Sequence, residues 1–199
     1  MIILIHGLKR SGKDTFASIL KELEPAVEIK PFAGPLKEIT AKAFDLAPSV
    51  VDYLKNDESI KIGFRSPQEK MYTGKTMRNF LQNLGTEAMK PIFGDYVWAK
   101  LFTDSYLKSP EGGIFVAPDF RVIEEYQYII SEATTANSDT IDIVTVKIQR
   151  DEAEESGDLH ISEQGLANFN FDYLIDNNGT LEDLRAEAVE FLDYLQAKL

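Results

Sequence analysis

The sequence has no cysteine, no long apolar run and a shortage of basic residues. Without cysteine the chain is not a disulfide-stapled domain, and it carries no redox signature that conflicts with a cytosolic setting. No apolar stretch approaches the roughly 20 residues of a membrane span. The apolar start, Met1 to His6, has no basic region before it, so we do not expect a signal peptide. These features predict a cytoplasmic protein.

The charge balance limits the kind of ligand. The chain has 33 acidic against 21 basic side chains, a net charge of −12. Nucleic-acid polymers are bound through basic surfaces that neutralise phosphates, so this chain is not expected to bind DNA or RNA. A small phosphorylated ligand remains compatible, because a local pocket can be basic on an acidic protein.

The chain is a globular sequence of 199 residues, of which 44% are hydrophobic, and its length suits one domain. Its apolar runs and helical periodicities alternate, which predicts a parallel, doubly wound α/β sheet. Residues 45–76 are polar and irregular, and we expect them to form an excursion from the core. The expected strands are 2–5, 27–32, 114–117, 141–148 and 173–175. The expected helices are 13–23, 35–44, a long one from 77 interrupted near Gly85 and Pro91, 97–107, 122–130 and one from Thr180.

A glycine-rich segment with the spacing of a phosphate-binding loop (P-loop) lies between the first expected strand and the first expected helix. In this context glycines let successive backbone N–H groups point at phosphate oxygens, and the helix N-terminus adds partial positive charge. Lys13 supplies a full positive charge to the β- and γ-phosphates. The predicted ATP contacts in this segment are Gly7, Lys9, Arg10, Ser11, Gly12, Lys13, Asp14 and Thr15.

The residue after Lys13 departs from the usual P-loop pattern. Asp14 occupies the position at which a serine or threonine hydroxyl usually ligates Mg²⁺, and Thr15 follows it. A carboxylate is a reasonable direct or water-mediated Mg²⁺ ligand. We expect Asp14 and Thr15 to lie near Mg²⁺, with Asp119 as a third candidate.

Other P-loop classes lack their signatures here. No Asn-Lys-x-Asp segment of GTPases occurs, and the best candidate for an acidic ATPase strand, Ile114 to Asp119, continues with Phe120 and Arg121. A small kinase remains, and such an enzyme needs arginines around its acceptor phosphate.

Several further segments, in this order, resemble those of the phage-type deoxynucleoside monophosphate kinases, and together they span nearly the whole chain. Apart from the P-loop none is specific alone, and phosphomevalonate kinases share the aspartate-bearing P-loop and a related layout. The segments are Gly7–Thr15, Pro31–Lys37, Phe80–Glu87, Asp119–Arg121, His160–Glu163 and Phe171–Thr180.

The resemblance implies a three-layer α/β/α P-loop kinase fold with a five-stranded parallel sheet in a single domain, 1–199. It also implies a helical substrate-binding excursion over about 36–108 and a short lid over about 150–165. The reaction would be ATP and a deoxynucleoside monophosphate giving ADP and the diphosphate, with Mg²⁺, in the host cytoplasm if the chain is phage-encoded. The sequence leaves the oligomeric state open, a homodimer being the commonest assembly.

Two residues at the end of the third strand are candidates for catalysis, because open α/β sheets bind ligands at this edge. Asp119 could hold Mg²⁺ or orient the acceptor, or it could simply cap a helix. Arg121 could hold the acceptor phosphate with its planar guanidinium, or form a surface ion pair with Glu124 or Glu125. The family commonly continues Phe-Pro-Asn-Glu after this arginine, whereas this chain does not.

Most substrate candidates lie in or beside the excursion. Lys37, Arg65 and Arg78 could contact the acceptor phosphate or be ordinary solvated cations. Gln82 and Glu87 could hydrogen-bond to the base or sugar. Phe32 and Trp98 could stack on the base or be core residues.

The end of the chain supplies the remaining candidates. Arg150 opens an acidic polar stretch in the lid position and is the cation expected over the transferring phosphoryl group. His160 is expected to hydrogen-bond locally. The turn from Asn177 through Gly179 to Thr180 resembles the loop beside the ATP adenine, and Thr180 is expected to cap the last helix.

Two alternatives to this assignment stay open at the level of sequence. One is another small-molecule kinase, acting on phosphomevalonate or a different nucleotide. The other is a nucleotide-binding regulator without turnover, which the presence of Arg65, Arg78, Arg121 and Arg150 disfavours.

Overall fold

The computed structural model describes residues 1–62, 74–109, 113–135, 141–151 and 166–198. Its chain forms two compact units, the first made of Met1–Phe32 and Ala99–Leu199 and the second of Ala33–Trp98. The second unit is thus inserted into the first. Among the described residues, no helix combines the length and apolar character needed to cross a membrane.

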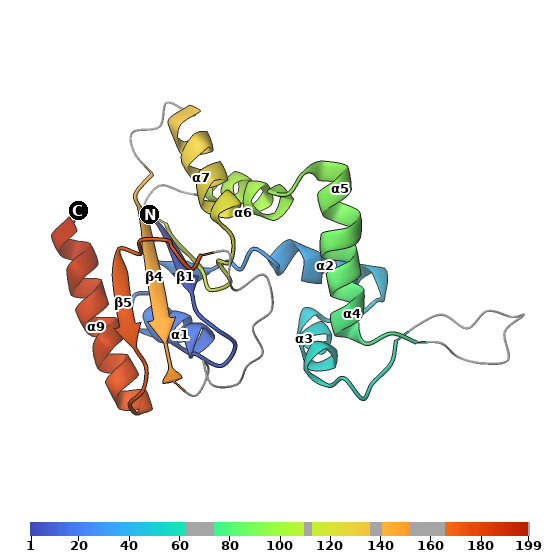
Figure 1. Ribbon diagram of the computed structural model, residues 1–199, viewed down its shortest axis with the longest axis horizontal. Coiled ribbons are helices and arrows are strands. Elements are labelled where there is room, and N and C mark those ends of the chain that lie inside the picture. Colours follow the sequence, from blue (N-terminus) through green and yellow to red (C-terminus); the bar gives the residue numbers. More distant parts are fainter. Residues whose placement is uncertain (63–73, 110–112, 136–140, 152–165, 199) are drawn as a thin grey trace, which may run out of the picture. The chain divides into compact units, whose positions relative to one another are not determined.

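The first unit is built on a five-stranded parallel sheet (Figure 1). Its strands are β1 (Ile2–His6), β2 (Val27–Ile29), β3 (Ile114–Ala117), β4 (Ile143–Gln149) and β5 (Tyr173–Asp176). Their order across the sheet is β2-β3-β1-β4-β5, and every neighbouring pair is parallel. β1 therefore lies in the middle, which explains why all five of its residues are buried.

Helices cover both faces of this sheet, giving the expected three-layer α/β/α fold. The helices of this unit are α1 (Lys13–Leu23), α6 (Val97–Leu107, starting at the unit boundary), α7 (Ile123–Thr135) and α9 (Leu181–Lys198). On one face Ile3 and Ile5 share a buried cluster with residues of α1 and α9. On the other face Phe115 contacts the rings of Phe102 and Tyr106 of α6.

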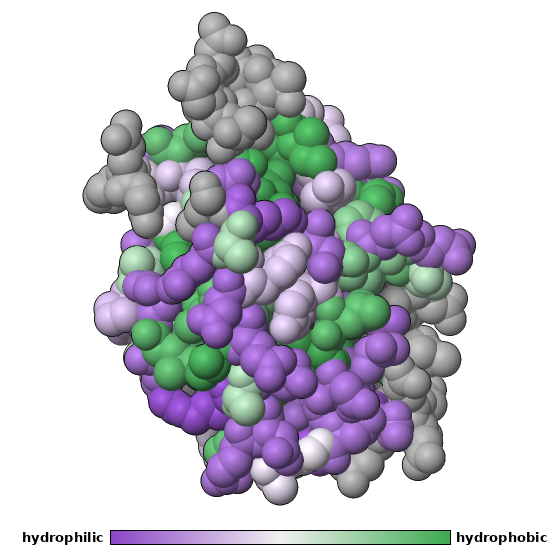
Figure 2. Space-filling model, turned by 90° about the vertical axis from the view of Figure 1, so that its left-hand side faces the viewer, coloured by the Kyte–Doolittle hydropathy of each residue, from purple (hydrophilic) through white to green (hydrophobic). Residues whose placement is uncertain are grey.

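The last helix shows why one stripe of its side chains is apolar. Leu184, Ala188, Phe191 and Leu195 are buried at the i, i+4, i+7 spacing of one helix face. The opposite side is solvated, and Figure 2 shows a largely hydrophilic surface on the side of the first unit that carries α9.

The second unit is helical. It contains α2 (Gly34–Ala43), α3 (Pro48–Asn56), α4 (Met77–Gln82), a π-helix (Asn83–Met89) and α5 (Lys90–Phe93). The expectation of an irregular 45–76 was wrong for the stretch that forms α3. Its intrinsic helix propensity is weak because Val50 and Val51 favour strands. Packing decides instead: Val51 is fully buried, and Asp52 of α3 pairs with Lys37 of α2 at 2.6 Å.

The expected interruption at Gly85 and Pro91 takes the form of a π-helix, so the helical path continues until Gly94 at φ 96°. Pro91 has no N–H to donate to a carbonyl four residues earlier, which favours a wider helical turn before it. Gly85 is needed for close packing, since a Cβ there would lie 2.8 Å from Leu36 Cδ2. Its carbonyl accepts a hydrogen bond from Trp98 Nε1 at 3.4 Å.

Strands β2 and β4 and helix α7 differ slightly from their expected ranges. β2 ends at Ile29, so Phe32 lies in the loop that follows, and α7 continues to Thr135. The remaining strands and helices of the first unit, including α1, α6 and β3, occur where the sequence predicts them.

We expect Asp172→Ala to destabilise the first unit. The Asp172 carboxylate accepts hydrogen bonds from the Thr145 backbone N–H at 2.9 Å and hydroxyl at 2.8 Å, and Thr145 is buried on β4. Leaving these donors unpaired costs about 1–3 kcal/mol of unfolding free energy, measurable by urea titration. The exposed carboxylate Asp193 provides the control, and Asp193→Ala should change stability by less than about 0.5 kcal/mol.

The same contacts give the stability a pH dependence. Burial raises the pKa of Asp172, but hydrogen bonds from Thr145 and the charge of Lys198 outweigh it, and the net pKa is lowered. A depressed folded-state pKa contributes stability that is present above the unfolded value near 3.8 and lost as pH falls through the folded value. The stability difference between wild type and Asp172→Ala should therefore shrink between neutral pH and about pH 3. A difference that grows on acidification would contradict this assignment.

Candidate functional site

The P-loop follows β1 directly and curls over the N-terminus of α1. Gly12 adopts φ 96° and Arg10 adopts φ 72°, both in the left-handed region, which is unusual for arginine. The Ser11 N–H donates to the Leu8 carbonyl at 3.1 Å, closing the turn. No side chain caps the start of α1 at Gly12, so the helix N-terminus is left to an anion.

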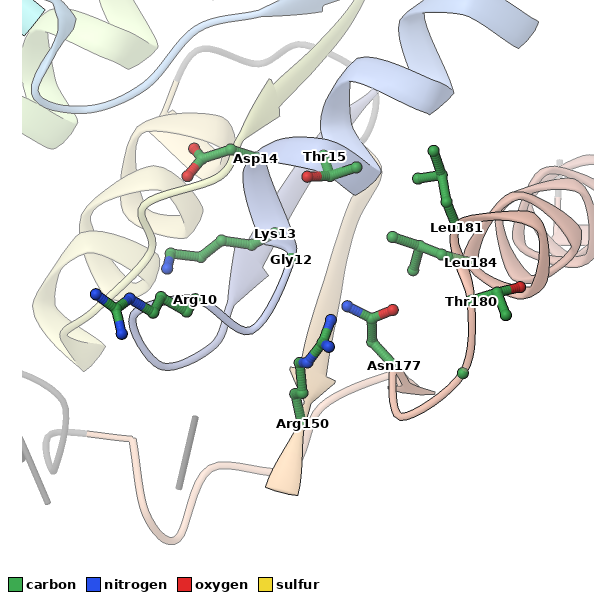
Figure 3. Close-up of a pocket in the computed structure, with 11 residues that line it drawn as sticks. Arg10, Gly12, Lys13, Asp14, Thr15, Arg150, Asn177, Thr180, Leu181 and Leu184 are labelled. Atoms are coloured by element: carbon green, nitrogen blue, oxygen red, sulfur yellow. The ribbon is translucent and has the colours of Figure 1, made fainter. Parts of the chain in front are cut away.

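A pocket of about 310 Å³ opens over this N-terminus (Figure 3). Two segments far apart in the sequence form it, the P-loop with the start of α1 and the turn between β5 and α9, together with Arg150 at the end of β4. Its lining residues are Arg10, Gly12, Lys13, Asp14, Thr15, Arg150, Asn177, Gly179, Thr180, Leu181 and Leu184.

Asn177 joins the two sides of this pocket. Its side chain is 5% exposed, and Nδ2 donates to the Ser11 carbonyl at 2.8 Å, across 166 residues of sequence. A Cβ at position 12 would collide with this amide, and the positive φ of Gly12 disfavours any other residue there. The expected adenine-side residue therefore also holds the P-loop in shape.

The turn that follows is fixed by a reciprocal cap at the start of α9. Thr180 Oγ1 accepts from the Asp183 N–H at 3.2 Å, while the Asp183 carboxylate accepts from the Thr180 N–H at 2.7 Å. Hydrogen bonds donated to this carboxylate by the Thr180 N–H and by the Thr180 hydroxyl lower the pKa of Asp183. Thr180 is thus the N-cap that the sequence predicted, in a capping-box arrangement.

The pocket is positively charged within an acidic chain. Arg10, Lys13 and Arg150 line it, against the single carboxylate of Asp14. Lys13 Nζ donates to the Leu8 carbonyl at 3.0 Å, so the ammonium is held at the loop. In Figure 3 the Arg150 guanidinium points toward the space between the P-loop and Asn177. This charge distribution suits a polyphosphate.

The predicted ATP residues fall into two groups. Arg10, Gly12, Lys13, Asp14, Thr15, Asn177 and Gly179 line the pocket together. Gly7 and Ser11 instead line a smaller neighbouring pocket, and Lys9 is exposed on the loop. Sequence reasoning missed Leu181 and Leu184 as pocket residues. Their helical spacing indicated only a buried stripe, although their place directly after the turn is a usable signal.

The pocket offers few protein ligands for a metal ion. Among the described residues, no group of three or more histidine, cysteine, aspartate or glutamate side chains could hold a metal ion. Asp14 and Thr15 are exposed side by side in the pocket. One carboxylate and one hydroxyl fit Mg²⁺ that is bound mainly through nucleotide phosphates and water.

Asp119 has a clear structural partner. Its Oδ1 accepts a hydrogen bond from the Phe32 N–H at 2.8 Å, which ties the loop after β2 to the end of β3. Phe32 itself is 2% exposed and packs against Phe102 at a ring distance of 4.9 Å. The loop is therefore anchored, and the Phe32 ring lies in the core.

Arg121 is exposed at the start of the segment leading to α7. Glu125 accepts hydrogen bonds from the backbone N–H groups of Arg121 at 3.0 Å and Val122 at 3.4 Å. Glu125 thus caps the helix start, and within the described chain the Arg121 guanidinium forms no ion pair with it.

The other substrate candidates lie in the second unit. Lys37 pairs with Asp52, and Arg78 pairs with Glu58 at 2.8 Å. Gln82 and Glu87 are exposed at the end of α4 and on the π-helix. Trp98 is 8% exposed and bonded to Gly85. Arg65, His160 and the expected lid beyond Asp151 lie outside the described residues.

Comparisons with known proteins bear on the family of this chain. A sequence model of the family described as deoxynucleotide monophosphate kinase matches residues 51–188. The deoxynucleotide monophosphate kinase of Enterobacteria phage T4 is 26% identical over 92% of this chain and 95% of its own length. That of Escherichia phage RB69 is 29% identical over 59% of this chain and 45% of its own.

The solved structure of a thymidylate kinase from Candida albicans is 13% identical in sequence to this chain. The match covers 98% of this chain and 92% of that kinase, with a TM-score of 0.46. The family model matches well over half of the chain. This chain therefore belongs to the deoxynucleotide monophosphate kinase family and is a phosphotransferase.

Proposed function

We propose that this chain transfers the γ-phosphoryl group of ATP to the phosphate of a deoxynucleoside monophosphate, giving ADP and a deoxynucleoside diphosphate for DNA synthesis. The observation that carries the proposal is the cationic P-loop pocket in a chain of this family. The reaction forms one P–O bond at the acceptor phosphate and breaks the bond between the γ-phosphorus and the bridging oxygen of ADP.

The ATP side of the reaction is assigned to the pocket of about 310 Å³. Backbone N–H groups around Gly12 and the start of α1 would hold the phosphates, with Lys13 and Arg10 neutralising their charge. The adenine would lie toward the turn at Gly179, against the apolar side chains of Leu181 and Leu184.

Mg²⁺ would be held near Asp14 and Thr15. The ion supplies charge neutralisation of the β- and γ-phosphates during transfer. Asp14 and Thr15, in the first turn of α1, would orient the ion. Asp119 is better supported as a positioning residue, because its carboxylate already accepts the Phe32 N–H.

The transferring phosphoryl group would be stabilised by arginine. Arg150 lines the pocket. Its guanidinium would stabilise the negative charge that develops on the γ-phosphate. Arg121 is the acceptor-side cation of the first unit, with an exposed guanidinium suited to a phosphate fork. Positioning and charge, more than proton transfer, account for catalysis in this class.

The second unit would supply contacts to the rest of the acceptor. Gln82 and Glu87 present an exposed amide and carboxylate on the helix that contains the π-turn. These groups can hydrogen-bond to the base or sugar. Lys37 and Arg78 pair with the carboxylates of Asp52 and Glu58, and each has further N–H donors for an acceptor phosphate. The ligands are free nucleotides rather than nucleic-acid polymers, which the net charge of −12 disfavours.

The proposal is tested by ADP release from ATP and Mg²⁺ with each deoxynucleoside monophosphate, its ribose counterpart and phosphomevalonate. We expect turnover with one or more deoxynucleotides. Lys13→Ala should lower kcat at least about 100-fold, because it removes the charge on the transferring phosphates. Activity on phosphomevalonate alone, or ATP binding without any acceptor-dependent ADP, would overturn the assignment.

We expect Asn177→Asp to raise the KM for ATP about tenfold or more, since it replaces the donor to the Ser11 carbonyl with a repelling carboxylate. Asn178→Asp is the control and makes the same charge change at the adjacent residue. The Asn178 side chain accepts the Asp151 N–H at 2.9 Å, and an aspartate can still do so. Steady-state kinetics with varied ATP separate the two. Equal effects of both variants would show that charge alone, and not the Asn177 bond, acts on ATP.

A further inference from the structure

A second, smaller pocket lies at the carboxyl ends of β1 and β4, next to the P-loop. Its volume is about 110 Å³, and its polar lining includes His6, Ser11, Lys147, Gln149 and Arg150. Only Arg150 is shared with the lining of the larger pocket. The other four residues are not in the lining of the larger pocket.

The small pocket is cationic. Lys147 and Arg150 line it, and no carboxylate is among its described lining residues. In the described part of the chain the Lys147 ammonium has no acidic partner, although the chain as a whole carries a charge of −12. An unpaired, half-buried lysine in an acidic protein favours an anion beside it.

Ser11 provides an independent sign of a ligand. Its side chain is 1% exposed, and within the described residues its hydroxyl has no hydrogen-bond partner. Buried hydroxyls are nearly always paired with protein, water or ligand. The missing Cβ of Gly7 makes room for this hydroxyl, since a side chain there would collide with Ser11 Oγ.

The wall of the pocket is fixed before any ligand binds. His6 and Lys147 are register partners on neighbouring strands, so their side chains share one face of the sheet. His6 Nδ1 lies 3.0 Å from the Phe120 carbonyl, which can only accept, so this nitrogen is the donor. The imidazole also stacks on Phe171 at 5.4 Å.

We propose that this pocket binds a phosphate group other than those of ATP, with Lys147 and Arg150 supplying charge and the Ser11 hydroxyl donating to a phosphate oxygen. At about 110 Å³, against about 310 Å³ for the ATP pocket, its volume suits a small group such as one tetrahedral oxyanion. The phosphate is either free inorganic phosphate or the phosphate end of an acceptor monoester.

Binding of inorganic phosphate tests the site directly. The ATP pocket is first filled with a non-hydrolysable ATP analogue and Mg²⁺, and phosphate is then titrated by calorimetry and by ³¹P NMR. Lys147→Gln should weaken phosphate binding about tenfold or more, the loss expected for one charge-assisted hydrogen bond. Lys108→Gln makes the same charge change at an exposed position directly after α6 and should leave phosphate binding unchanged.

Ser11→Ala distinguishes a ligand site from a packing effect. Removing an unpaired buried hydroxyl should leave the thermal unfolding midpoint equal or higher, while phosphate affinity falls about threefold or more. Wild-type phosphate affinity in both Lys147→Gln and Ser11→Ala, or no phosphate bound beyond the ATP site, would overturn the proposal and leave water as the partner of Ser11.

Steady-state kinetics distinguish the two sources of the phosphate. Only this kinetic experiment rests on the proposed function. If an acceptor monoester places its phosphate here, Lys147→Gln raises the KM for the acceptor with little change in the KM for ATP, and inorganic phosphate competes with the acceptor. If free phosphate is the ligand, Lys147→Gln weakens phosphate binding by the same factor and leaves both KM values unchanged. A chain without kinase activity would fail the assay of the proposed function and still bind phosphate here.

Discussion

The position of β1 in the middle of the sheet is the constraint on which the site depends. Its first four side chains, Ile2 to Ile5, are apolar and buried on both faces, so it must lie between two other strands. β3 and β4 flank it in parallel, and their carboxyl ends therefore meet the P-loop at one edge. The connection after β1 runs toward one edge of the sheet, to β2, and the connection after β3 runs toward the other, to β4. Parallel sheets bind ligands in the crevice that opens at such a switch point.

The two pockets at this edge show how an acidic protein can hold phosphate. The larger pocket gathers its cations from segments distant in sequence, whereas both cations of the smaller one come from the end of β4, and Arg150 contributes to both. The surplus of carboxylates lies elsewhere, including the exposed side of α9. Long-range repulsion of polyanions and local attraction of a small phosphate are thus compatible, because the field within a cleft is set by its nearest charges.

The second unit enters the chain between β2 and α6, and packing rather than local propensity maintains its helices. The carbonyl of Gly85 accepts a hydrogen bond from the Trp98 indole N–H. The Leu36 side chain packs so close to Gly85 that it would meet a Cβ at that position. A π-helix is rarely stable by itself and occurs frequently at functional sites. Here the π-helix carries Glu87 and begins directly after Gln82. Both are polar side chains for which the sequence predicts a contact with the acceptor.

The sequence by itself determined the parallel α/β class, the P-loop with Lys13, and the last helix with its Thr180 cap. These features depend on periods and spacings within a few residues, which local backbone physics controls. Only the tertiary structure showed that Asn177 holds the Ser11 carbonyl and that Asp119 anchors the Phe32 loop. It also decided that α3 is helical and that Lys147 stands beside His6. Such contacts join residues far apart in the chain, and no local pattern encodes which partner a buried amide, carboxylate or ammonium will meet.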